Sequence, residues 1–200
     1  MDGIPFPGLP KLLLSANHLV DLSLTNIPHS GYISPEAVIV LLSVLSSVKT
    51  LSLKFQSPQS LPERETPPSP PQKRSVLPTL DFFNFKGVVE YLEDLVTFID
   101  TPQLNYFFIT FFNEIEFDTP RLAQFIDRHR TPKLGIRNAD VQFNDKFAHI
   151  GIPRGSRTLE IAISCRGPDW QLSSVAQVCN SALHPLSMVR TSTSSIDIRN

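Results

Sequence analysis

One short pattern of six residues recurs along the chain. It consists of an apolar residue, two variable residues, a second apolar residue, one variable residue and a third apolar residue. The four clearest copies are LVDLSL, VKTLSL, LPTLDF and LNYFFI, with the middle apolar residues Leu22, Leu51, Leu80 and Phe107. These middle residues lie 29, 29 and 27 residues apart. Two weaker copies, TPKLGI around Leu134 and TLEIAI around Ile161, continue the spacing at 27. Such regular spacing indicates an internal repeat with one short strand in each unit.

Helical periodicity follows several of these strand motifs. Ser34 and Pro35 predict an N-cap followed by proline at the first helical position, with an apolar stripe behind them. Thr119 and Pro120 predict a second helix start of the same kind. The four apolar stripes are Val38, Leu41, Leu42 and Leu45; Leu92, Leu95, Val96 and Ile99; Leu122, Phe125 and Ile126; and Leu172, Val175, Ala176 and Cys179. Strands and helices are therefore expected to alternate along most of the chain.

A strand and a helix every 27 to 29 residues form the unit of a leucine-rich-repeat solenoid. The sequence therefore predicts an α/β fold of about six irregular repeats, with a curved parallel sheet on the concave face and helices and loops outside. Residues 1–200 are expected to form this single array. Within it, residues 137–157 are expected to be irregular and residues 195–198 to form a last strand.

Residues 56–78 interrupt the alternation. They contain seven prolines and five charged residues, a composition that cannot form a helix and has little apolar surface to bury. We expect a disordered loop insertion in place of the second helix. A functional alternative makes Pro67 to Pro71 a polyproline ligand for an aromatic-lined groove, whereas the simpler interpretation is a tolerated surface insertion.

Alternate residues of each predicted strand leave the core and line the concave surface. In the first two strands these outward residues are polar, as with Asp21 and Thr50, whereas in the third and fourth strands they include several aromatic residues. Aromatic clusters at a surface are typical of protein-binding sites. The predicted partner-binding residues are Phe83, Tyr106, Phe108, Thr110 and Phe112. The alternative is that the proline-rich loop or further repeats cover these phenylalanines.

The stretch from Phe6 to Phe125 resembles the leucine-rich-repeat region of mushroom-type fungal F-box-like proteins. Its most specific blocks are NIPHSGYISPE at 26–36 and EYLEDL at 90–95. In that family an F-box helix bundle binds the adaptor of a cullin-RING ubiquitin ligase, and the repeats select a partner. The F-box pattern is not visible in these 200 residues, so the resemblance implies adaptor binding only if an F-box lies upstream.

Composition and charge narrow the class of protein. Hydrophobic residues make up 41% of the chain, and the formal net charge of −1 gives no electrostatic reason to expect nucleic acid or an anionic membrane as partner. No signal peptide or membrane-spanning run is visible, and Cys165 and Cys179 are too few for a disulfide framework. These features predict a cytoplasmic or nuclear protein.

Candidate chemistry is sparse. His18, His29, His129, His149 and His184 are scattered without metal-ligand spacing, and the two cysteines are typical of small buried side chains. Glu93 and Asp94 are neighbours on a predicted helix and are expected to point to different faces. We therefore expect no catalytic residue, metal or cofactor. An enzyme site within 137–155, using Asp140, Asp145 and His149, is the minor alternative.

Taken together, the patterns predict a non-catalytic protein-protein interaction module, the substrate-recognition repeat region of an F-box-like ubiquitin-ligase receptor. The alternatives are a truncated or degenerate paralogue without ligase coupling and a stand-alone repeat scaffold. The chain begins inside a repeat and ends after a strand-like segment, which predicts either a fragment of a longer protein or an array with exposed ends.

Overall fold

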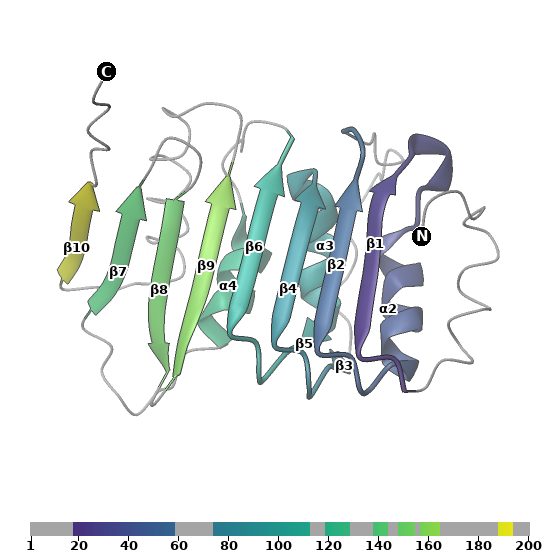
Figure 1. Ribbon diagram of the computed structural model, residues 1–200, viewed down its shortest axis with the longest axis horizontal. Helices are drawn as coiled ribbons and strands as arrows, with labels where there is room; N and C mark the ends of the chain where they lie inside the picture. The colour runs from purple at the N-terminus through teal and green to yellow at the C-terminus, as the bar shows by residue number, and fades with distance from the viewer. Residues whose placement is uncertain are drawn as a thin grey trace, which may run out of the picture.

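The computed structural model describes residues 18–58, 74–112, 119–128, 138–143, 148–154, 157–164 and 188–193. Within these ranges the chain has a mixed α/β fold, in which three α-helices accompany an eight-stranded, mostly parallel sheet. The strand order is β1-β2-β4-β6-β9-β8-β7-β10 (Figure 1). The predicted α/β class is thus confirmed.

The first half of the sheet is regular. Its strands β1 (Asp21–Ile27), β2 (Thr50–Phe55), β4 (Phe82–Gly87) and β6 (Tyr106–Phe111) are parallel neighbours. Helices α2 (Pro35–Val44), α3 (Val89–Phe98) and α4 (Pro120–Arg128) lie behind these strands in Figure 1. Their apolar stripes and the inward residues of the strands are buried together in one core. Parallel strands need such crossover connections, and the helices cover the sheet face that would otherwise expose these residues.

The same backbone hydrogen bonds join each regular strand to the next. The carbonyl of Val20 accepts from the N–H groups of residues 49 and 50, at 2.8 and 3.1 Å. In turn, the Lys49 carbonyl accepts from residues 81 and 82, and the Asp81 carbonyl from residues 105 and 106. Because the bond recurs at every step, the four strands begin at the same level and their residues fall into rows across the sheet.

The register corrects the third copy of the apolar pattern. Leu51 of β2 pairs with Phe83 of β4, which pairs with Phe107 of β6. Phe83 therefore takes the inward position, where its side chain is 0% exposed, and its prediction as an outward, partner-binding residue is wrong. The outward residue is Phe82. The apolar residues that match the other copies of the pattern are therefore Leu80, Phe83 and Phe85. They lie three residues after the corresponding residues of LPTLDF, which are Leu77, Leu80 and Phe82.

The start of α2 confirms the predicted helix signal. Ser34 Oγ accepts a hydrogen bond from the Ala37 N–H at 3.2 Å, and Pro35 follows as the first helical residue. Helices α3 and α4 are also confirmed, although Ile99 belongs to a short strand, β5 (Ile99–Asp100), rather than to α3.

Residues 74–78 of the proline-rich segment are ordered, which corrects the prediction of one disordered loop over 56–78. The end of this segment forms β3 (Ser75–Val76), which pairs in parallel with β5. Leu77 is buried, and the Arg74 Nε donates to the Thr97 carbonyl at 3.2 Å. The buried side chain of Leu77 and the pairing of β3 with β5 thus anchor the returning chain near the end of α3. Residues 59–73, with Pro67 to Pro71, lie outside the described residues.

The second half of the sheet follows a different order. The strand beside β6 is β9 (Arg157–Ser164), which then pairs antiparallel with β8 (Ala148–Arg154). Strand β8 pairs antiparallel with β7 (Asn138–Phe143), and β10 (Met188–Thr193) lies parallel to β7. The expected strand at TLEIAI is confirmed as β9, whereas β7 and β8 correct the expectation that 137–157 is irregular. The predicted strands at 131–136 and 195–198 and the predicted helix around 172–179 lie outside the described residues.

Candidate functional site

The sheet has two unlike faces. The three α-helices lie on one side, and no other described element lies over the opposite side of β1, β2, β4, β6 and β9, which we call the open face (Figure 1). The strand register arranges its outward residues in three rows. The rows are Asp21, Thr50, Phe82, Tyr106 and Glu160; Ser23, Ser52, Asn84, Phe108 and Ala162; and Lys54, Lys86, Thr110 and Ser164.

Three aromatic side chains gather near the middle of the open face. The ring centroid of Phe82 lies 6.4 Å from that of Tyr106 and 5.3 Å from that of Phe108. Tyr106 is 45% exposed, and the two phenylalanines are half-buried. We call these three residues the aromatic patch. Cross-strand aromatic contacts of this kind stabilise the pairing of β4 with β6 while leaving apolar area in contact with water.

Not all of the predicted partner-binding residues lie on the open face. Tyr106, Phe108 and Thr110 lie on the open face as expected. Phe112 follows the end of β6, is half-buried, and has the Lys86 Nζ 5.1 Å from its ring centroid. Phe83 is excluded by its burial in the core. The sequence pattern missed Phe82, because the copy LPTLDF assigns that residue to the core.

Charged groups flank the aromatic patch at both ends of the strands. Lys54 and Lys86 are direct neighbours at the carboxyl ends of β2 and β4. In the first row, Glu160 Oε2 lies 2.8 Å from the Nε2 of His149, which β8 brings to the same face. The amino ends of the strands border a hollow of about 640 Å³ lined by Asp21, Lys49, Thr50, Thr79, Asp81 and Gln103, with Val20 and Pro78. The face is therefore acidic towards its amino end and basic towards its carboxyl end.

The opposite side is a close-packed layer. Phe83 stacks on Phe107 at 5.0 Å between ring centroids, and Phe125 of α4 covers Phe107 at 5.7 Å. Tyr91 of α3 is fully buried, and its hydroxyl donates to the Ile33 carbonyl at 2.8 Å. Burial raises the pKa of Tyr91 well above its ordinary value, with smaller contributions from Tyr32 and Glu36. These side chains serve packing and are closed to a ligand.

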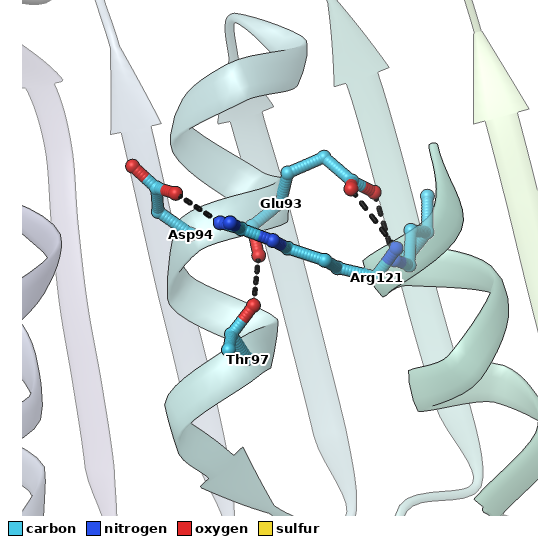
Figure 2. A network of polar contacts seen from close by, with 5 residues as sticks. Glu93, Asp94, Thr97 and Arg121 are labelled. Carbon is cyan, nitrogen blue, oxygen red and sulfur yellow. Dashed lines mark hydrogen bonds and ion pairs between the residues drawn. The ribbon is translucent and has the colours of Figure 1, made fainter. Parts of the chain in front are cut away.

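Glu93 and Asp94 of α3 extend in different directions, and both contact Arg121 at the start of α4 (Figure 2). The Glu93 carboxylate accepts from the backbone N–H groups of Arg121 at 3.0 Å and Leu122 at 2.7 Å. The Arg121 guanidinium donates to Asp94 at 2.6 Å. The first-turn N–H groups of α4 thus gain a negatively charged acceptor, which a helix N-terminus favours. The cluster therefore joins α3 to α4.

The histidines are the other candidates for chemistry or metal binding in the described ranges. His18 and His29 are exposed, and the Nε2 of His149 contacts the Glu160 carboxylate. Within the described ranges, no three His, Cys, Asp or Glu side chains gather closely enough to hold a metal ion. Cys165, Cys179, His129, His184 and Asp145 lie outside these ranges.

Comparison with known proteins adds no relative. No protein-family model, curated protein or solved structure matches the chain. None of the described helices is long and apolar enough to cross a membrane. The open face is the feature from which a function can be argued.

Proposed function

We propose that the chain is a non-catalytic interaction module that binds another protein on its open face. The single observation that carries this proposal is the aromatic patch of Phe82, Tyr106 and Phe108, on the side of the sheet away from the helices. Partly exposed aromatic side chains held by a rigid sheet lose little conformational entropy when a partner covers them, so they are favoured at protein interfaces.

We further propose that the regular half of the sheet is a leucine-rich-repeat array. The repeated hydrogen bonds at residues 20, 49 and 81 and the shared register of β1, β2, β4 and β6 support this interpretation. The partner then lies across the strand face, where repeat arrays offer a broad surface.

The proposed biological setting is an F-box-like ubiquitin-ligase receptor in the cytoplasm or nucleus, in which this chain selects the substrate. Its support is the resemblance carried by residues 26–36 and 90–95. An in-frame F-box upstream of Met1 and co-purification of the full gene product with a cullin-RING adaptor are the expected results. If the full product contains no F-box and no adaptor co-purifies, a stand-alone scaffold replaces the ligase receptor.

Site-specific photocrosslinking tests the binding face. The photoreactive amino acid p-benzoylphenylalanine replaces Phe108 in one variant and Val40 in a matched control, because Val40 is 61% exposed on the helix side. We expect one protein to crosslink from position 108 and not from position 40. Phe108→Ser should abolish its association with the chain, whereas Val40→Ser should retain it.

Two results would contradict the proposed face: equal crosslinking from both positions, or undiminished association of the folded Phe108→Ser protein. Circular dichroism of each variant confirms that it is folded, so that a lost association reports on the face and not on unfolding.

A further inference from the structure

Two lysines lie side by side on the open face with no opposite charge between them. Lys54 of β2 pairs in register with Lys86 of β4, and both side chains are half-buried. No carboxylate among the described residues forms an ion pair with either lysine, and the Lys86 Nζ lies over the ring of Phe112, 5.1 Å from its centroid. Like charges directly opposite each other on neighbouring strands are destabilising. An anionic group bound between the two ammonium groups would relieve this repulsion.

The aromatic patch lies along the same strands as this lysine pair. Phe82 and Lys86 are four residues apart on one face of β4, a distance of about 13 Å at the rise of a strand. Phe108 pairs in register with Asn84, one row closer to Lys86. The open face therefore presents an apolar area over the first two rows of β4 and β6, and a cationic pair in the third row of β2 and β4.

We propose that the open face binds an extended acidic segment of another protein, with an apolar side chain on the aromatic patch and a carboxylate between Lys54 and Lys86. This inference rests on the proposed function and adds the chemistry of the partner. An extended chain covers the distance between the two areas in about four residues. Asp21 and Glu160 lie at the opposite end of the face, where they disfavour a second acidic group and so set the direction of the segment.

Single-stranded nucleic acid is the competing occupant, because aromatic side chains on a sheet with lysines nearby also stack bases. Its phosphates require a positive groove along the whole strand. Here Asp21 and Glu160 share the row of Phe82 and Tyr106, so acidic side chains interrupt the positive charge along the strands. The charge pattern therefore favours an acidic peptide.

Selection from a random dodecapeptide phage library tests the proposal. Against the full chain we expect selected peptides to contain an apolar or aromatic residue and an Asp or Glu about four positions away. Against the double variant Lys54→Glu and Lys86→Glu, we expect the selected acidic residue to be replaced by Lys or Arg. The matched control is Lys49→Glu, which reverses an exposed charge at the amino end of the strands and should leave the selection unchanged.

Fluorescence anisotropy then measures how tightly the most frequently selected peptide binds the unaltered protein and the variants. The double variant should weaken its binding at least about tenfold, and added salt should weaken binding to the unaltered protein. Selection of apolar residues without acidic ones, lost in Phe108→Ser but unaffected by lysine reversal, would overturn this inference and leave the proposed function standing. Unchanged selection by both the Phe108 and lysine variants would remove both.

Two further measurements separate the other occupants. Tighter binding of oligo-uridylate than of the selected peptide, lost in the lysine double variant, would overturn the proposal in favour of nucleic acid. Light scattering that shows a dimer of the chain, dissociated by Phe108→Ser, would assign the face to a second copy. A monomer that prefers the acidic peptide is the expected result.

Discussion

Phe82 and Phe83 are consecutive residues of one strand, yet they belong to opposite faces of the sheet. Each ring contacts a phenylalanine of β6: Phe83 contacts Phe107 at 5.0 Å, and Phe82 contacts Phe108 at 5.3 Å. On the inner side, Phe125 of α4 covers Phe107, whereas Phe108 lies in a row of the open face and is half-buried. The two ring contacts are similar in distance, but α4 covers only the contact on the inner side of the sheet.

The Phe83–Phe107 contact on the helix side stabilises the fold, whereas the Phe82–Phe108 contact leaves apolar surface available for a partner. Removal of a whole side chain from water contributes most of the stability that an aromatic residue supplies, and a ring contact adds about 0.5 to 1.5 kcal/mol. The inner pair gains both contributions. The outer pair gains the ring contact and only part of the burial, so a partner that covers the patch can still remove apolar surface from water.

Alanine substitution at the two consecutive positions measures this difference directly and has the largest expected effect. Phe83→Ala should lower the free energy of unfolding by about 3 to 5 kcal/mol, because it leaves a cavity beside Phe107. Phe82→Ala should lower it by only about 1 to 2 kcal/mol, since its ring is half-exposed and the loss is limited to its ring contacts and partial burial. Urea unfolding followed by circular dichroism provides both values. Equal losses would show that the two faces are equally packed and would contradict the comparison.

The assignment of these two residues also shows where sequence patterns are ambiguous. Leu77, Leu80 and Phe82 fit the apolar pattern as well as Leu80, Phe83 and Phe85 do. The two alternatives place opposite sides of β4 in the core, and only pairing with Leu51 of β2 decides between them. The pattern therefore predicted the strand but reversed its faces.

Local signals were sufficient elsewhere in the regular half. Ser34 and Pro35 mark the start of α2, and Thr119 and Pro120 mark the start of α4, because these helix-start signals are local in the sequence. The acceptor that Glu93 supplies to the first turn of α4 comes from another helix and has no such local signal. Strand neighbours depend on distant parts of the chain. The 27-residue spacing predicted residues 131–136 beside β6, yet the neighbour is β9, which starts at Arg157. Long-range pairing of this kind leaves no mark in local periodicity.

We also expect the contacts of Glu93 with the first turn of α4 to stabilise the packing of α3 against α4. Glu93→Gln should lower the free energy of unfolding by about 2 kcal/mol, because one of two backbone N–H groups loses its acceptor and the charge at the helix N-terminus disappears. Glu90→Gln is the matched control, since Glu90 is exposed on the same helix and should cost less than about 0.5 kcal/mol. Thermal unfolding of both variants measures the difference. Similar losses would assign the effect to helix charge alone, whereas the predicted difference assigns it to the link between α3 and α4.

The smallest expected change concerns one hydroxyl in the covered layer and depends on pH. Tyr91→Phe removes the hydrogen bond to the Ile33 carbonyl and should cost about 1 kcal/mol at neutral pH. In the native protein the raised pKa keeps Tyr91 protonated above pH 10, where the tyrosine of the unfolded chain ionises. The unfolded state therefore binds fewer protons there, and the stability of the unaltered protein falls as pH rises.

The phenylalanine variant lacks this ionisation, so its deficit in the free energy of unfolding should shrink above pH 10. Urea titrations of both proteins across this range measure the difference. A deficit that stays constant would mean that the hydroxyl ionises equally in both states and is therefore open to water. A deficit that narrows would show that the helix side excludes water at Tyr91 while the open face, one sheet layer away, keeps Tyr106 exposed.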